Sequence, residues 1–235
     1  MNVNEVMQEL EALGKERTKK IYLSNGAHEP LFGVATGAMK PMAKQIKKNQ
    51  PLAEQLYATG NYDAMYFAGV IADPKAMSPA DFERWMDAAY FYMLSDYVVA
   101  VTLAETDIAQ DVADTWIASG EELRMSGGWS CYCWLLGSRK DAEFEEDKLR
   151  QMLAQVEQTI HTAPERAKIA MNLFIYTVAI SYVSLHDLAV ETAKKVRPVQ
   201  VGQDKPKSKL ISASDNIQKA MERNQLGFKR KYVRC

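Results

Sequence analysis

The sequence predicts an all-α fold made of short helices packed in antiparallel pairs. Apolar residues recur at helical spacing in almost every segment, whereas runs with the two-residue alternation typical of β-strands are few. Turns of only about two to six residues separate the helices, and a connection that short makes consecutive helices run antiparallel. Together these observations predict a succession of helical hairpins.

In the first half of the chain, turn and capping residues mark the helix boundaries. Gly60-Asn61 separates two helices. Ser78-Pro79-Ala80-Asp81 supplies an N-cap, a proline in the first turn and an acid three residues after the cap. The helices predicted here cover residues 3–20, 38–48, 51–59, 61–72, 79–92 and 96–105.

In the second half, Ser119-Gly120 and Gly137-Ser138 mark breaks, and Ser184-Leu185-His186-Asp187 resembles a capping box. Residues 164–181 are apolar on nearly all sides, which is typical of an inner helix. Residues 196–209 contain two prolines and clustered charge, so we expect a linker there. The predicted helices cover residues 108–119, 121–136, 145–162, 164–181, 185–196 and 213–224.

The spacing of the helix pairs fits two architectures. Pairs such as 51–59 with 61–72, and 145–162 with 164–181, recur at intervals of roughly 35–45 residues, which is the period of HEAT and armadillo repeats that stack into a solenoid. A closed helical bundle also accommodates antiparallel pairs of this length. Periodicity alone does not choose between them.

Length and composition are those of an ordinary globular protein. A chain of 235 residues with 47% hydrophobic and 25% charged residues is large enough for one domain with a substantial core or for two small ones. No apolar run reaches the ~18 residues that a membrane helix needs. The first residues, MNVNEVMQELEAL, are acidic and amphipathic, unlike a secretory signal. We therefore expect a cytoplasmic protein that does not enter a membrane.

The few cysteines and histidines do not suggest a metal site. Three cysteines are an odd and sparse count, which argues against a disulfide framework. Cys131 and Cys133 are two positions apart on a predicted helix and so point to different faces. His28, His161 and His186 lack the spacing of metal ligands. We expect no metal and no cofactor.

The charge of the chain is unevenly distributed. Residues 205–235 carry nine Lys or Arg against two acids, a net +7, which leaves −8 for the remainder of a chain whose total is −1. A basic tail on an acidic body suggests a polyanionic partner, although solvated basic tails without a partner are common.

Other cations gather at predicted helix faces and ends. On residues 38–48, Lys40, Lys44, Lys47 and Lys48 share one broad face, opposite Met42 and Ile46. Such a face is either simply solvated or contacts phosphates, which position nucleic acid without reading its sequence. Further cations of this kind are Arg139, Lys140, Arg166 and Lys168.

An acid interrupts the apolar run from Tyr90 to Val101. Burying an ionised carboxylate costs several kcal/mol unless it is paired, so Asp96 is either a helix cap or a working group. As a cap, Ser95-Asp96 would begin a helix at Tyr97. As a working group, Asp96 would face a groove with Tyr92 one turn before it and Arg124 nearby, although Arg124 is equally compatible with a surface ion pair.

Four segments carry a resemblance to a known family, in matching order and spacing between about residues 30 and 195. They are Leu31-Phe32-Gly33-Val34, residues 52–72 (LAEQLYATGNYDAMYFAGVIA), Trp116-Ile117-Ala118-Ser119 followed by Leu123-Arg124, and residues 167–179. With them the chain resembles the HEAT-like-repeat DNA alkylation repair family typified by AlkD. The resemblance implies a right-handed α-solenoid that grips duplex DNA and hydrolyses the N-glycosidic bond of N3- or N7-alkylated purines.

The resemblance also implies roles for particular residues. The family's catalytic aspartate falls on Asp96, its first aromatic wall on Tyr92 in place of tryptophan, and its arginine on Arg124. The second tryptophan of the family falls on Leu173 or Phe174. An alkylated purine is cationic and already a good leaving group, so a carboxylate that stabilises the developing sugar cation and orients a water suits the reaction.

We therefore predict a HEAT-like-repeat domain over residues 1–196, followed by a basic extension over residues 197–235 with one short helix. The expected function is DNA alkylation repair by a monomer that binds duplex DNA through the cations named above. Two alternatives are a DNA-binding relative without catalytic activity and a protein-interaction scaffold, because repeat solenoids offer surfaces to either kind of partner.

Overall fold

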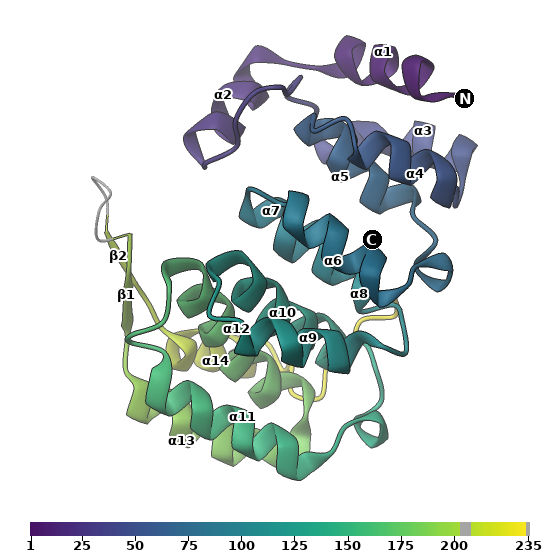
Figure 1. The fold of residues 1–235 in the computed structure, drawn as a ribbon. Helices are drawn as coiled ribbons and strands as arrows, with labels where there is room; N and C mark the ends of the chain where they lie inside the picture. The colour runs from purple at the N-terminus through teal and green to yellow at the C-terminus, as the bar shows by residue number, and fades with distance from the viewer. Residues whose placement is uncertain (203–207, 234–235) are drawn as a thin grey trace. The chain divides into compact units, whose positions relative to one another are not determined.

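A computed structural model describes residues 1–202 and 208–233 of the chain. The contacts divide the chain into two compact units, Met1–Thr106 and Asp107–Cys235, which are described separately (Figure 1). Both units are built from short helices connected by tight turns. The prediction of an all-α fold is confirmed.

The first unit places its helices in consecutive pairs. Their order is α1 (Val3–Leu13), α2 (Glu16–Ser24), η1 (Thr36–Met39), α3 (Lys40–Ile46), α4 (Gln50–Tyr57), α5 (Tyr62–Ile71), η2 (Pro74–Ala76), α6 (Pro79–Ala88), α7 (Tyr92–Leu94), η3 (Ser95–Val99) and α8 (Ala100–Leu103). Helix α5 is central: it packs against α1, α3, α4 and η3, and eight of its ten residues are buried.

A buried carboxylate on α5 organises the segment that follows α2. Asp63 accepts hydrogen bonds from the backbone N–H groups of Phe32 (2.6 Å), Gly33 (2.9 Å) and Val34 (2.8 Å). These three N–H groups belong to an extended segment without a strand partner, so the carboxylate replaces the hydrogen bonds of regular structure. Burial raises the pKa of Asp63, and the three donors oppose that rise by favouring the ionised form.

The second unit continues the pattern of helix pairs. Its elements are α9 (Ala109–Ala118), α10 (Glu122–Leu136), η4 (Asp141–Glu143), α11 (Glu146–Thr159), α12 (Glu165–Ser181), η5 (Val183–Leu185), α13 (His186–Val196), β1 (Val199–Val201), β2 (Lys209–Ile211) and α14 (Ala213–Glu222). Helix α12 packs against α10, α13 and α14, and twelve of its seventeen residues are buried. The prediction that residues 164–181 form an inner helix is confirmed.

The segment predicted as a linker is partly folded onto this unit. Strand β1 pairs with β2 in antiparallel register, with Val199 opposite Ile211. Val199 and Val201 are buried, and β1 packs against α12. The linker interpretation of residues 196–209 is therefore wrong for the described part of that range, because alternate valines give the segment a buried face. Residues 203–207 lie outside the described residues.

Several helix boundaries differ from those predicted. The predicted helix 3–20 is two helices, because Gly14 is extended and the N–H of Lys15 donates to the carbonyl of Gly33. The predicted helix 38–48 ends at Ile46, after which Lys47 takes a positive φ of 62°. The predicted helix 79–92 ends at Ala88.

Two capping predictions have opposite outcomes. Ser78 and Asp81 form the capping box expected at the start of α6. Ser184 does not cap α13, since its hydroxyl donates to Glu146 and the helix begins after Leu185 without a side-chain cap. The Ser184 prediction is wrong because a tertiary partner takes the hydroxyl.

Among the residues that the structure describes, no single helix is long and apolar enough to cross a membrane. Helix α12 and the segment Val183–Val196 reach the length and hydropathy of a membrane-spanning helix only when they are taken together. The chain bends by 113° between them.

Candidate functional site

Asp96 lies in the middle of a helix that changes its winding. The chain enters α7 at Tyr92 and takes a π-helical turn in η3 before it continues as α8. The alternative that Asp96 caps a helix beginning at Tyr97 is therefore wrong, since the helix starts five residues earlier. Single π-turns inside α-helices occur frequently at functional sites, because they redirect a side chain out of the regular helical pattern.

The carboxylate of Asp96 is almost fully buried. Only 5% of the residue is exposed, and the hydroxyl of Ser95 donates to its Oδ1 atom at 2.8 Å. A neighbouring hydrogen-bond donor lowers the cost of keeping a carboxylate in this environment. Ser95, the neighbouring residue in the π-turn, thus supplies one hydrogen bond to the carboxylate.

The π-turn is packed tightly against α5 through a glycine. A Cβ added at Gly69 would lie 2.6 Å from Cγ1 of Val98, closer than real carbon atoms approach. Any larger side chain at this position would push η3 away from α5. Gly69 therefore sets the distance between the central helix and the turn that carries Asp96.

Tyr92 belongs to a connected group of aromatic rings. Its ring lies 4.6 Å from that of Phe91 and 6.5 Å from that of Tyr97, both in edge-to-face geometry. Tyr92 is half-buried, whereas Tyr97 is 43% exposed. Phe91 in turn contacts Tyr62, which contacts two further rings. These two are Tyr22 and Tyr66.

The sequence did not single out Tyr22, Tyr62 or Tyr66 as neighbours of Tyr92. They come from α2 and α5, and only tertiary structure brings them together. The hydroxyl of Tyr22 donates to the carbonyl of Val34 at 2.8 Å, and burial raises the pKa of Tyr22 to about 12. The apolar run from Tyr90 to Val101 was the available signal in the sequence, and it identified only the part of the group near α7 and η3.

Arg124 lies near the start of α10 in the second unit, whereas Asp96 and Tyr92 belong to the first. Its side chain is 16% exposed, and its Nε donates to the carboxylate of Glu121 at 3.1 Å. Arg124 therefore forms an ion pair with Glu121, which is one of the two interpretations that the sequence allowed for this residue. The catalytic roles assigned to Asp96, Tyr92 and Arg124 remain predictions.

The positions matched to the family's second tryptophan differ from each other. Leu173 is 38% exposed, whereas Phe174 is fully buried against Trp129 with ring centroids 5.0 Å apart. Of the two, Leu173 is the side chain that reaches the surface of α12.

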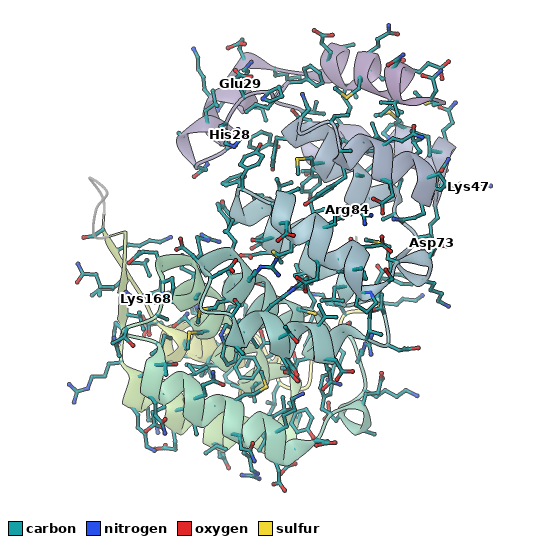
Figure 2. All side chains as sticks on the ribbon, viewed as in Figure 1. His28, Glu29, Lys47, Asp73, Arg84 and Lys168 are labelled. Atoms are coloured by element: carbon teal, nitrogen blue, oxygen red, sulfur yellow. The ribbon has the colours of Figure 1, made fainter. Side chains whose placement is uncertain are left out.

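The four lysines predicted on one helix face are all exposed. Lys40 and Lys44 lie on α3, and Lys47 projects outward just beyond its end (Figure 2). Lys48 lies 3.7 Å from a carboxylate oxygen of Asp73, and it shares a weaker contact with a second acid. Lysines on an exposed segment of this kind suit contact with phosphates.

The cations predicted on the second unit are more constrained. Arg139 pairs with Glu143 at 3.6 Å and Lys168 with Glu165 at 3.5 Å. Lys168 is only 9% exposed, which limits its access to a ligand. Lys140 is exposed and Arg166 half-buried.

Part of the basic tail is bound to the second unit. Lys229 donates to the carbonyl of Leu136 at 2.9 Å and pairs with Asp141 at 2.7 Å. The guanidinium of Arg230 lies over the ring of Trp134, 4.6 Å from its centroid. These two cations therefore stabilise the end of α10. Three further tail cations, Lys205, Lys207 and Arg234, lie outside the described residues, as does Cys235.

Among residues 1–202 and 208–233, no group of three His, Cys, Asp or Glu side chains is arranged to hold a metal ion. Among the described residues, Cys131 is buried and Cys133 half-buried, and neither takes part in a disulfide. Burial raises the pKa of the Cys131 thiol, as expected for a packing residue.

Successive antiparallel helix pairs define the class as a helical-repeat protein. The model of the DNA alkylation repair enzyme family matches residues 6–217, and the chain belongs to that family. The suspected family is thereby confirmed.

Similar proteins extend over nearly the whole chain. The uncharacterized protein Lmo0209 of Listeria monocytogenes is 30% identical over 92% of this chain and 96% of its own length. Lin0241 of Listeria innocua is 29% identical over 92% and 95% respectively.

A solved structure aligns with all of this chain and all of its own, at 72% identity and a TM-score of 0.97. It represents a new family of proteins related to the HEAT-like repeat DNA glycosylases with affinity for branched DNA structures. The predicted solenoid class of HEAT-like repeats is confirmed, in preference to a closed bundle.

Proposed function

We propose that this protein binds DNA and prefers branched structures to linear duplex. The observation that carries the proposal is the full-length match, at 72% identity, to a protein related to the HEAT-like repeat DNA glycosylases with affinity for branched DNA structures. The two chains also share their fold over their whole length, with a TM-score of 0.97.

The exposed lysines of the first unit supply a physical basis for DNA binding. Lys40, Lys44 and Lys47 lie close together in sequence, and all three side chains are exposed while Met42 of the same segment is buried. Each phosphate neutralised by such a side chain releases counterions, so the affinity falls as salt rises. Sequence-independent contacts of this kind suit recognition of DNA shape.

Fluorescence anisotropy with a four-way junction, a three-way junction and a linear duplex of matched sequence tests the proposal. We expect tighter binding to both junctions than to the duplex. The triple variant Lys40→Gln, Lys44→Gln, Lys47→Gln is expected to reduce the slope of log affinity against log salt by about 0.9 for each phosphate that the variant no longer neutralises. Lys75→Gln, another exposed lysine of the same unit, serves as control. Equal affinity for all three substrates would contradict the preference.

A second candidate function is hydrolysis of the N-glycosidic bond in cationic N3- or N7-alkylpurines. It is favoured by the buried Asp96 in a π-turn beside Tyr92. In this mechanism Asp96 stabilises the developing sugar cation and positions a water, Tyr92 forms an aromatic wall, and Arg124 holds a phosphate.

Single-turnover excision from duplex DNA that contains N7-methylguanine tests this second function. Base release by the wild-type protein and its loss in Asp96→Asn would support it. Asp107→Asn, an exposed aspartate of the other unit, is the control substitution. Absence of release at high protein concentration would exclude the enzymatic function and leave DNA binding intact.

The proposal includes a cytoplasmic monomer that acts on DNA directly. Light scattering of the protein with and without a junction measures its stoichiometry. A protein that binds neither junctions nor duplex would favour the remaining alternative, a scaffold for other proteins.

A further inference from the structure

The first unit contains a cavity of about 380 Å³ between α4 and α6. Two stacked aromatic pairs and one charged pair contribute to its wall, and small residues complete it. The aromatic residues come from four parts of the unit: His28 follows α2, Tyr57 ends α4, Trp85 lies on α6 and Tyr90 follows α6. This α4–α6 pocket is separate from the turn that carries Asp96.

The aromatic pairs fix the shape of the pocket. The rings of Tyr57 and Trp85 are parallel, with centroids 4.1 Å apart and an interplanar angle of 2°. The hydroxyl of Tyr57 donates to the carbonyl of Trp85 at 2.7 Å, which holds α4 to α6. At the rim, the exposed ring of His28 stacks on Tyr90 at 3.5 Å. Of the two pairs, the His28–Tyr90 pair is the one with an exposed ring.

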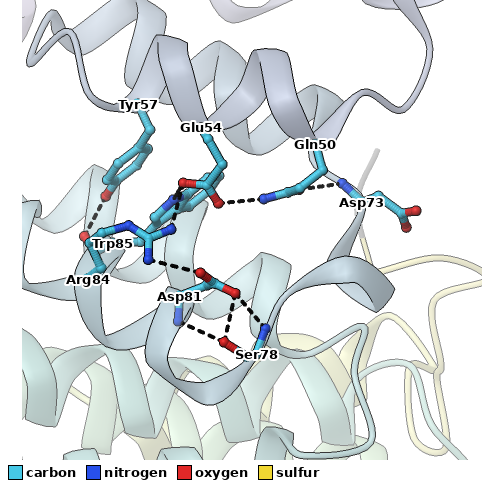
Figure 3. A network of polar contacts seen from close by, with 8 residues as sticks. All are labelled: Gln50, Glu54, Tyr57, Asp73, Ser78, Asp81, Arg84 and Trp85. Carbon is cyan, nitrogen blue, oxygen red and sulfur yellow. Dashed lines mark hydrogen bonds and ion pairs between the residues drawn. The ribbon is translucent and has the colours of Figure 1, made fainter.

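The charged groups of the pocket already have partners (Figure 3). Glu54 accepts hydrogen bonds from Arg84 (2.8 Å), the indole of Trp85 (3.0 Å) and Gln50 (2.7 Å). Arg84 also pairs with Asp81 at 2.9 Å. A guanidinium held between two carboxylates is a poor receptor for an anion.

A quaternary ammonium group is an equally poor match. Cages for such cations present the faces of several rings to the ligand. Here Tyr57 and Trp85 turn their faces to each other and are 4% and 1% exposed. The carboxylate of Glu54 is engaged by three donors. An uncharged planar ring is a better match, because it can continue the exposed His28–Tyr90 stack and form hydrogen bonds at its edge.

We propose that the α4–α6 pocket binds one unpaired purine base. A purine is flat, uncharged and within the range of ligands that cavities of this size accept. It can extend the His28–Tyr90 stack. At its edge it can donate to the remaining lone pair of Glu54 Oε1, which takes only the Gln50 donor, and accept from the N–H groups of Arg84 that its two carboxylate partners do not use. The proposal rests on the proposed function, because the source of the base is a branch point in DNA. A free nucleoside offers the same chemistry.

The test compares two tryptophan substitutions at exposed alanines that each end a helix. Ala88→Trp fills the pocket from the end of α6, whereas Ala118→Trp sits at the end of α9, away from it. A third variant, His28→Ala, removes the stacking ring without opening the core, with His161→Ala as its control.

The DNA probes are three-way junctions with two unpaired residues at the branch, either adenine or abasic. We expect the wild-type protein to bind the adenine junction about tenfold more tightly, since stacking of one base on aromatic side chains is worth about 1–3 kcal/mol. Ala88→Trp and His28→Ala should lose that preference, and Ala118→Trp and His161→Ala should retain it. With 2-aminopurine as the unpaired base, the same variants should abolish the fluorescence change on binding.

Two results would overturn the proposal, and they are distinguishable from failure of the proposed function. If adenine and abasic junctions bind equally well, the pocket does not take the base, although binding of branched DNA stands. If no junction binds, the proposed function fails, and the pocket is tested with adenosine alone. Chemical shifts of the methyl group of Met65, which lines the pocket, then report occupancy, with Ala88→Trp as blocked control. An unchanged Met65 signal at saturating adenosine overturns the pocket assignment.

Discussion

Replacement of Asp63 tests how strongly one carboxylate organises the first unit. Asp63→Ala removes the acceptor of three backbone N–H groups and leaves them inside the protein. An unsatisfied buried donor costs about 1–3 kcal/mol, and Gly33 and Val34 are buried while Phe32 is half-buried. Allowing for relaxation of the segment, we expect a loss of about 3–5 kcal/mol in the free energy of unfolding, a large share of the total for a domain.

Urea unfolding followed by circular dichroism measures this loss. Asp63→Asn keeps one acceptor oxygen and should lose less, whereas Asp107→Asn, at an exposed position, should remain within about 0.5 kcal/mol of the wild-type protein. Hydrogen exchange of the amides of Phe32, Gly33 and Val34 should accelerate in Asp63→Ala under native conditions. A loss below about 1 kcal/mol with unchanged exchange at these amides would refute the reasoning.

Three further perturbations follow from the surroundings of individual residues. Gly69→Ala should destabilise the protein by about 1–3 kcal/mol because a Cβ there would lie 2.6 Å from a neighbouring side chain, whereas Gly37→Ala, with open space around it, should not. Burial raises the pKa of Tyr22 to about 12, so the contribution of this tyrosine to stability is complete below pH 10 and is lost as the pH rises towards 12. In a titration followed by absorbance at 295 nm, Tyr22→Phe should remove a step near pH 12 and leave the steps near pH 10 unchanged. Arg230→Ala should lower the free energy of unfolding by about 0.5–2 kcal/mol because the cation no longer stacks on Trp134, and an unchanged melting curve would contradict a stabilising role.

Hydrophobic periodicity was sufficient to predict that the fold is all-α, because most helices bury one stripe and expose the other, but it did not choose between a solenoid and a closed bundle. The start of α6 was also predictable, since Ser78 and Asp81 cap it through local hydrogen bonds. The break between α1 and α2 was not. It depends on Gly14, where an added Cβ would lie 2.5 Å from the carbonyl oxygen of Phe32, a residue distant in sequence.

The candidate site was predictable only in part, because contacts between residues distant in sequence determine where its parts lie. Asp96 was noticed because it is an acid in an apolar run. The residues around it in the sequence do not predict the π-turn, nor the glycine on α5 that sets the position of this turn. The α4–α6 pocket is assembled from four separate segments, and its four rings have no common spacing in the sequence. Single-residue chemistry can be seen in a sequence, whereas cavities form only when segments meet.

The final helix has a consequence for the behaviour of the protein in solution. The end of a stack of repeated helices is an exposed apolar face, through which molecules associate unless the last helix is polar on its outer side. In α14, Ala213, Ile217 and Ala220 are buried, while the opposite side exposes mainly polar and charged residues. Truncation of the chain after residue 196 would therefore remove the polar outer side of α14 and expose the apolar surface that this helix covers. We expect two truncated molecules to associate through the uncovered faces of α12 and α13, so that the fraction of dimer rises with concentration.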